Sequence, residues 1–120
     1  MQVAFFEWLA MTPYASPLIF HVPNGGFRPG NSGYQMKRQG VKAGVSDIIA
    51  LYPRGGYHGL IIELKFGSGK VTPEQNNFLT LADGQDYCTK VIWDDWLLAR
   101  DFFLKYMNGL IKVEAPSFIS

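Results

Sequence analysis

Two apolar segments joined by a short turn constrain this chain more than any other part of its sequence. Residues 47–52 and 59–66 have the composition of buried β-strands, and the six residues between them include the proline and glycines typical of a turn. Three charged residues nonetheless lie within these strands, namely Asp47, Glu63 and Lys65. Because a charge is costly to bury without a partner, charges at these positions indicate a specific role.

The alternation of side chains along a strand places Glu63 and Lys65 on one face of the second strand. Antiparallel pairing with the first strand brings Asp47 beside Glu63, in a register that the connection leaves open by one or two residues. Two carboxylates this close raise each other's pKa unless a cation lies between them, and such oxygen ligands suit Mg²⁺ or Mn²⁺. The alternative is an exposed ion pair of Glu63 and Lys65 on a half-covered strand.

The remaining segments predict a mixed β-sheet flanked by α-helices, within a single domain of 120 residues. Val3, Phe6 and Ala10 recur at the spacing of a helical face. Thr72 and Gln75 have the spacing of a capping box at the start of a helix. In chain order, we expect a helix over 2–11, a strand over 17–23, a loop over 24–33, a helix over 34–40, strands over 47–52 and 59–66, a helix from 73 to about 84, a strand over 87–93, a helix over 95–107 capped by Asp94, and a short edge strand over 110–115.

Composition places the chain among globular proteins, with 48% apolar and 18% charged residues. Cys88 is the only cysteine, so no disulfide forms within the chain, and we expect a reducing, cytoplasmic setting. No apolar run approaches the roughly 20 residues that cross a bilayer, so we expect no membrane association. The N-terminal segment contains Glu7 and lacks the basic region that begins a signal peptide.

Charge is distributed unevenly although the net charge is only +1. No acidic residue lies between Glu7 and Asp47. The loop over 24–33 within this interval lacks the Gly-Lys-Ser/Thr ending of a phosphate-binding P-loop, so we expect no nucleotide cofactor. A solvated basic surface is one explanation of the interval, and contact with the phosphates of DNA is the other. The candidate DNA-binding residues are Arg28, Lys37, Arg38 and Lys42.

The spacing of Asp47, Glu63 and Lys65, followed by a helix with Gln75, resembles the PD-(D/E)XK nuclease superfamily. Within that superfamily, the chain resembles the virus-type replication-repair nuclease (VRR-NUC) family. The segments HVPNGG, KRQGVKAGVSDIIALYP, GLIIELK and TPEQNNFL occur in the family's order over most of the chain. Ser46 stands where the superfamily pattern has proline. The resemblance implies an α/β fold of the restriction-endonuclease-like kind.

The resemblance also implies the roles of the site residues. Lys65 corresponds to the lysine that positions the attacking water and stabilises charge on the phosphate. The residues that correspond to ligands of a catalytic Mg²⁺ or Mn²⁺ are Glu7, Asp47, Glu63 and, through its backbone carbonyl, Leu64.

Other positions have two explanations each. Gln75 corresponds to the glutamine that faces the family's active site, and it also suits a capping box with Thr72; both roles can hold together. Glu7 can lie on the polar face of an amphipathic helix without binding a metal. His21 is a candidate general base or, alternatively, a histidine packed among aromatic residues in a strand.

The activity implied by the resemblance is hydrolysis of DNA phosphodiester bonds by a metal-dependent endonuclease of phage or bacterial origin, acting on Holliday junctions or other branched DNA in repair. Two symmetric nicks in a four-way junction require two sites, which a two-fold homodimer supplies. A nuclease that acts on flaps or ends remains an alternative. A DNA-binding or assembly module without cleavage is another, although clustered carboxylates near phosphate argue against it.

Overall fold

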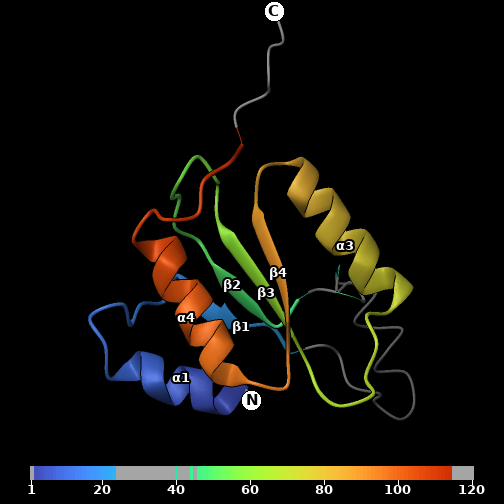
Figure 1. Cartoon of the computed structure of the whole chain (residues 1–120), viewed down its shortest axis with the longest axis horizontal. Helices are drawn as coiled ribbons and strands as arrows, with labels where there is room; N and C mark the ends of the chain where they lie inside the picture. Colours follow the sequence, from blue (N-terminus) through green and yellow to red (C-terminus); the bar gives the residue numbers. More distant parts are fainter. Residues whose placement is uncertain (1, 24–39, 41–43, 45, 115–120) are drawn as a thin grey trace, which may run out of the picture.

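A four-stranded mixed sheet lies between helices in the computed structural model, which describes residues 2–23, 40, 44 and 46–114 (Figure 1). The sheet order is β1-β2-β3-β4, with antiparallel pairing of β1 with β2 and of β2 with β3, and parallel pairing of β3 with β4. Helices α1 and α4 pack together on one face, while α3 packs on the other. The predicted α/β architecture is therefore confirmed. The elements are α1 (Gln2–Ala10), β1 (Ile19–His21), β2 (Ile48–Ala50), β3 (Leu60–Lys65), α3 (Pro73–Gly84), β4 (Cys88–Trp93) and α4 (Trp96–Met107).

The main apolar core lies on the face of the sheet that α1 and α4 cover. Alternate residues of β3, Leu60 and Ile62, are fully buried there. The rings of Phe5 in α1 and Phe103 in α4 meet edge to face, with centroids 5.6 Å apart. Because side chains alternate along a strand, Ile61, Glu63 and Lys65 point to the opposite face, where α3 lies.

The buried face of α1 differs from the expected one. Phe5 and Leu9, one helical turn apart, are buried in the core, whereas Val3 is 63% exposed. Only two residues of this helix are polar, so the apolar pattern does not select one side. Packing against α4 makes that selection.

The start of α4 lies one residue later than expected. Asp95, not Asp94, is its N-cap, and the Asp95 side chain accepts a hydrogen bond from the Leu97 N–H at 2.9 Å. Two consecutive aspartates both satisfy the sequence rule for an N-cap, which explains the error.

The expected edge strand over 110–115 is wrong for its described part, since residues 110–114 form no strand. The Val113 N–H donates to the Gly55 carbonyl at 2.9 Å, so this segment is attached to the turn between β2 and β3 and not to the sheet. The predicted loop 24–33 and nearly all of the predicted helix 34–40 lie outside the described residues. Within the described ranges, no helix is long and apolar enough to cross a membrane.

Candidate active site

The pairing of β2 with β3 places the two candidate carboxylates side by side. Ile48 lies opposite Ile62, so the preceding residue, Asp47, lies opposite Glu63. The Asp47 carboxylate also accepts a hydrogen bond from the Leu64 N–H, with an Oδ2–N distance of 2.9 Å. The juxtaposition expected from strand alternation and pairing is therefore observed.

The side-chain amide of Gln75 joins the two charged residues of β3. Its Oε1 accepts a hydrogen bond from Lys65 Nζ at 2.6 Å, and its Nε2 donates to Glu63 Oε1 at 2.9 Å. Lys65 Nζ also lies 3.5 Å from Glu63 Oε1. Gln75 thus connects the N-terminus of α3 to the charged face of β3.

The same glutamine belongs to the capping box of α3. The Gln75 N–H donates to Thr72 Oγ1 at 3.1 Å, and the Thr72 N–H donates to Gln75 Oε1 at 2.9 Å. Both explanations of Gln75 from the sequence therefore describe real contacts, because one oxygen accepts from the cap and from Lys65 together. Fixing the amide oxygen in this way directs the amide nitrogen toward Glu63.

A glycine allows the first turn of α3 to approach this region closely. Gly44 has a left-handed φ of 81°, and a Cβ at this position would lie 2.5 Å from the Glu74 carbonyl carbon. A larger residue would collide with the helix backbone and would also be strained at this φ. Gly44 therefore helps to determine where the Gln75 side chain begins.

Glu63 has the most perturbed environment among these residues. The residue is only 1% exposed, and within the described part of the chain its Oε2 has no hydrogen-bond partner. Burial and then the charge of Asp47 raise the pKa of Glu63 to about 7, against the opposing effect of Lys65. Near neutral pH without a cation, its protonated and ionised forms are therefore comparably populated.

The oxygen atoms around Glu63 suit a hard divalent cation. Glu63 Oε2 is a buried acceptor without a partner among the described residues, and the Asp47 carboxylate lies across from it. The N–H and C=O of one strand residue point to the same side, so the Leu64 carbonyl faces the β2 side, as its N–H does. The described residues contain no group of three or more His, Cys, Asp or Glu side chains that could hold a metal. Two carboxylates and a backbone carbonyl, completed by water, match the coordination preferences of Mg²⁺.

Among the described residues, Glu7 forms no metal-binding group of three with this carboxylate pair. It is exposed on α1 and lines a pocket that His21 also lines. His21 Nδ1 lies 3.0 Å from the Asp47 carbonyl oxygen, which also accepts from the Val22 N–H. Because a carbonyl can only accept, Nδ1 carries the proton in this contact. His21 thus supports the backbone of Asp47.

Two further predictions from the sequence concern Ser46 and the candidate DNA-binding residues. Ser46, at the position of the superfamily's proline, is fully buried, and no described residue bonds to its Oγ. The candidate DNA-binding residues all lie outside the part of the chain that the structure describes; they are Arg28, Lys37, Arg38 and Lys42.

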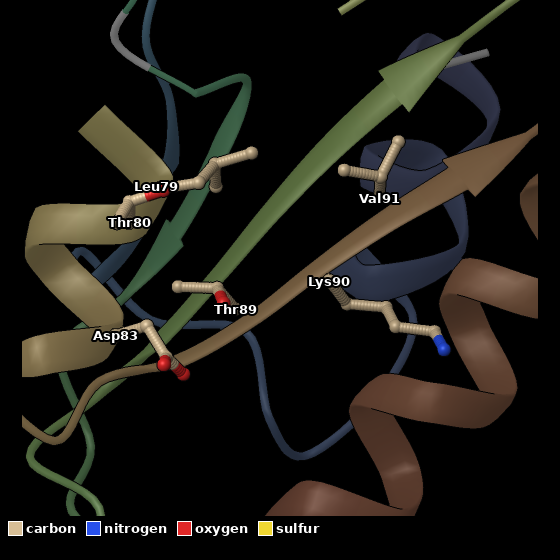
Figure 2. Close-up of a pocket in the computed structure, with 6 residues that line it drawn as sticks. All are labelled: Leu79, Thr80, Asp83, Thr89, Lys90 and Val91. Carbon is tan, nitrogen blue, oxygen red and sulfur yellow. The ribbon is translucent and has the colours of Figure 1, made fainter. Parts of the chain in front are cut away.

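A separate hollow lies between α3 and the outer strand β4 (Figure 2). Asp83 is one of the α3 residues on its wall, whereas Lys90 of β4 extends toward α4 (Figure 2). The Lys90 ammonium lies 5.5 Å from the centre of the Phe102 ring. The charged groups here are thus directed apart and form no catalytic cluster. The lining residues are Leu79, Thr80, Asp83, Thr89, Lys90 and Val91.

One residue that the sequence did not assign to the site contacts its backbone. The Asp94 N–H donates to the Lys65 carbonyl at 2.8 Å, and the Asp94 carboxylate accepts from the Gly67 N–H. The sequence offered no signal for this role, because Asp94 also satisfied the rule for a helix cap.

The sheet, its flanking helices and the charged strand pair define a restriction-endonuclease-like, nuclease-type domain. Residues 4–93 match the model of the VRR-NUC domain family, and the chain belongs to this family. The chain is similar to a solved structure described as a VRR_NUC domain protein, with 27% sequence identity and a TM-score of 0.76 over 90% of this chain and 85% of that chain. No curated protein matches the chain.

Proposed function

We propose that this protein is a Mg²⁺- or Mn²⁺-dependent endonuclease that hydrolyses phosphodiester bonds in branched DNA, including four-way junctions. The observation that carries the proposal is the buried Glu63 carboxylate, whose Oε2 has no hydrogen-bond partner among the described residues, opposite Asp47 and beside Lys65. Membership of the VRR-NUC family supports a nuclease-type activity.

The residues that would hold the cation are Asp47, Glu63 and, through its carbonyl, Leu64. A divalent cation at this position would lower the pKa of a bound water molecule and would screen the negative charge of the phosphate. Removing one of these ligands should therefore abolish cleavage without unfolding the chain.

Lys65 and Gln75 supply the fixed part of the site. Lys65 carries a positive charge beside Glu63, where it would stabilise charge that develops on the phosphate. Gln75 holds both side chains through hydrogen bonds of 2.6 and 2.9 Å, so neither has to be ordered during the reaction. The capping box of α3 in turn holds the Gln75 amide.

A binding or assembly module without cleavage is less consistent with this geometry. Two adjacent carboxylates repel each other and repel phosphate, and Glu63 is buried at the cost of a pKa raised to about 7. A surface that only bound DNA would gain nothing from such a pair. A nuclease specific for flaps or DNA ends shares the chemistry and differs in substrate alone.

Cleavage assays on linear, flap and four-way DNA with Mg²⁺, Mn²⁺ or EDTA test the proposal. We expect cleavage of branched substrates with either cation and none with EDTA. Glu63→Gln provides the matched control, because it keeps the shape of the side chain while removing its charge. Full activity in EDTA would reject the metal-dependent mechanism, and DNA binding without any cleavage would favour the binding module.

A further inference from the structure

Strand β2, as the structure describes it, does not extend to the end of β3 that carries Lys65. The β2–β3 pairing includes Ile48 opposite Ile62, whereas Lys65 lies three residues further along β3. On its other side, Lys65 is in register with Trp93, the last residue of β4. On this side, β4 and the residue that follows it hold the Lys65 backbone.

Asp94 makes two hydrogen bonds to this end of β3. Its N–H donates to the Lys65 carbonyl at 2.8 Å, and its carboxylate accepts from the Gly67 N–H. The two bonds hold the backbone at Lys65 and two residues beyond it. One residue thus fixes both the end of the strand and the start of the following turn.

The backbone of Asp94 is in an unusual conformation. Its φ of 61° lies in the left-handed region, which residues other than glycine rarely adopt. Glycine would satisfy this φ without strain but has no side chain to accept from Gly67. An aspartate provides the acceptor and tolerates the left-handed region better than most residues.

We propose that Asp94 is a positioning residue that holds Lys65 in its catalytic place. This inference rests on the proposed nuclease function. By fixing the Lys65 backbone, Asp94 keeps the flexible lysine side chain within 2.6 Å of Gln75 Oε1 and 3.5 Å of Glu63 Oε1. It lies one residue beyond the segment that matches the family model, which ends at residue 93.

Asp86 offers a matched control at the opposite end of β4. Its φ of 62° is nearly the same as that of Asp94. Its backbone N–H donates to the Asp83 carbonyl, and its carbonyl accepts from the His58 N–H, so its contacts are with the end of α3 and with the residues that precede β3. Substitutions at Asp86 and Asp94 therefore change the same backbone strain, but only one of them changes contacts with the end of β3.

The test compares Asp94→Gly, Asp86→Gly and Asp94→Asn in the full chain. Both glycine variants are free of strain at this φ, so both should fold. We expect Asp94→Gly to lower kcat for junction cleavage about 10-fold with little change in KM, because small displacements of a catalytic group are costly. Asp86→Gly should keep the parent kcat. Asp94→Asn should stay within about twofold of the parent, since its amide oxygen can accept from Gly67.

Amide hydrogen exchange at Gly67 provides a readout that does not depend on cleavage. Exchange should accelerate in Asp94→Gly and remain slow in Asp86→Gly and in Asp94→Asn. Equal kcat values for the two glycine variants, or an unprotected Gly67 amide in the parent, would overturn the positioning role. A parent that cleaves no DNA with Mg²⁺ or Mn²⁺ would overturn the nuclease proposal itself, whatever the exchange data show.

Discussion

At the scale of single residues, Lys65 distinguishes a catalytic site from a structural ion pair. We expect Lys65→Ala to leave folding and DNA binding largely intact and to lower cleavage on the order of 10²-fold, because the lost charge acts in the chemical step. Lys105→Ala is the control, since it removes an exposed lysine from α4. Thermal unfolding, DNA binding and junction cleavage should be measured on both variants. Cleavage at the parent rate in Lys65→Ala would contradict the assignment.

Asp47 should respond to substitution in a different way. Asp47→Asn removes an anionic ligand and should abolish cleavage, yet its side-chain oxygen can still accept from the Leu64 N–H. Repulsion with Glu63 disappears, so without metal this variant should be at least as stable as the parent. Thermal unfolding in EDTA beside a cleavage assay checks both expectations. A large loss of stability would instead indicate that Asp47 has a structural role.

The raised pKa of Glu63 predicts how stability depends on pH without metal. The pKa of Glu63 is about 7 in the folded protein, compared with its ordinary value of 4.5, which applies to the unfolded chain. Between these two pH values, the folded protein therefore binds more protons than the unfolded chain. The stability that this group contributes is complete below about pH 4.5 and is lost as the pH rises through about 7. Unfolding temperatures in EDTA from pH 5 to 8 should therefore fall more in the parent than in Glu63→Gln.

Added metal should oppose this trend in the parent. A divalent cation binds the ionised carboxylate, so the stabilisation by Mg²⁺ should grow as the pH rises toward 8. The same titration in Glu63→Gln should show a weaker stabilisation. An identical pH dependence of the two proteins in EDTA would show that Glu63 titrates normally.

Strand geometry alone was sufficient to predict the carboxylate pair from the sequence. Alternation along β3 and pairing with β2 were enough to place Asp47 beside Glu63. The contacts of Gln75 with Lys65 require the position of the α3 N-terminus, which no local pattern specifies. The role of Asp94 depends on a turn conformation that two adjacent aspartates made ambiguous.

At the scale of elements, we expect the N-terminus of α3 to serve both stability and the proposed chemistry, and two substitutions should separate these roles. Thr72→Ala removes the side-chain acceptor of the cap and should cost about 1 kcal/mol of stability. Gln75→Glu keeps an acceptor for the Thr72 N–H, but it places a further buried carboxylate against Glu63, where repulsion with Asp47 is already present. It cannot donate to Glu63, so its cleavage should fall more than that of Thr72→Ala.

Thermal unfolding and kcat measured on the same two proteins test this expectation. We expect Thr72→Ala to lose stability while keeping most of its kcat, and Gln75→Glu to lose kcat as well as stability. If both variants lost stability equally and retained the parent kcat, Gln75 would be a capping residue only.

The elements also show where local patterns are insufficient. The capping box of α3 was visible in the sequence because it depends on residues three positions apart. The buried face of α1 was not, since nearly every residue of that helix is apolar. Residues 110–114 have the composition of a strand, but the hydrogen bond between Val113 and Gly55 attaches them to a turn instead.

At the scale of the whole molecule, the two faces of the sheet have separate tasks. On one face, Leu60 and Ile62 of β3 pack in the core beneath α1 and α4. On the other, Glu63 and Lys65 meet Gln75 of α3. The order of helices and strands predicted the mixed sheet, and the alternation of residues along β3 predicted its two faces. Substitutions on the charged face should therefore affect activity more than folding.

The molecule also exposes apolar side chains on both of its helical faces, as expected if part of its surface binds a second copy. Leu98 on α4 is 53% exposed, and Leu81 on α3 is 63% exposed. Symmetric cleavage of a four-way junction requires two active sites, which a two-fold dimer supplies. We therefore expect the parent to sediment as a homodimer at micromolar concentration.

Leu98→Glu and Leu81→Glu test the two faces separately, because a charge at a dimer interface is costly when buried. One variant should sediment as a monomer and lose paired cleavage of four-way junctions, while the other should behave as the parent and serve as its control. Since both side chains are exposed in the single chain, neither change should unfold it. A parent that sediments as a monomer at micromolar concentration and still makes paired nicks would contradict the homodimer, because one site would then be sufficient.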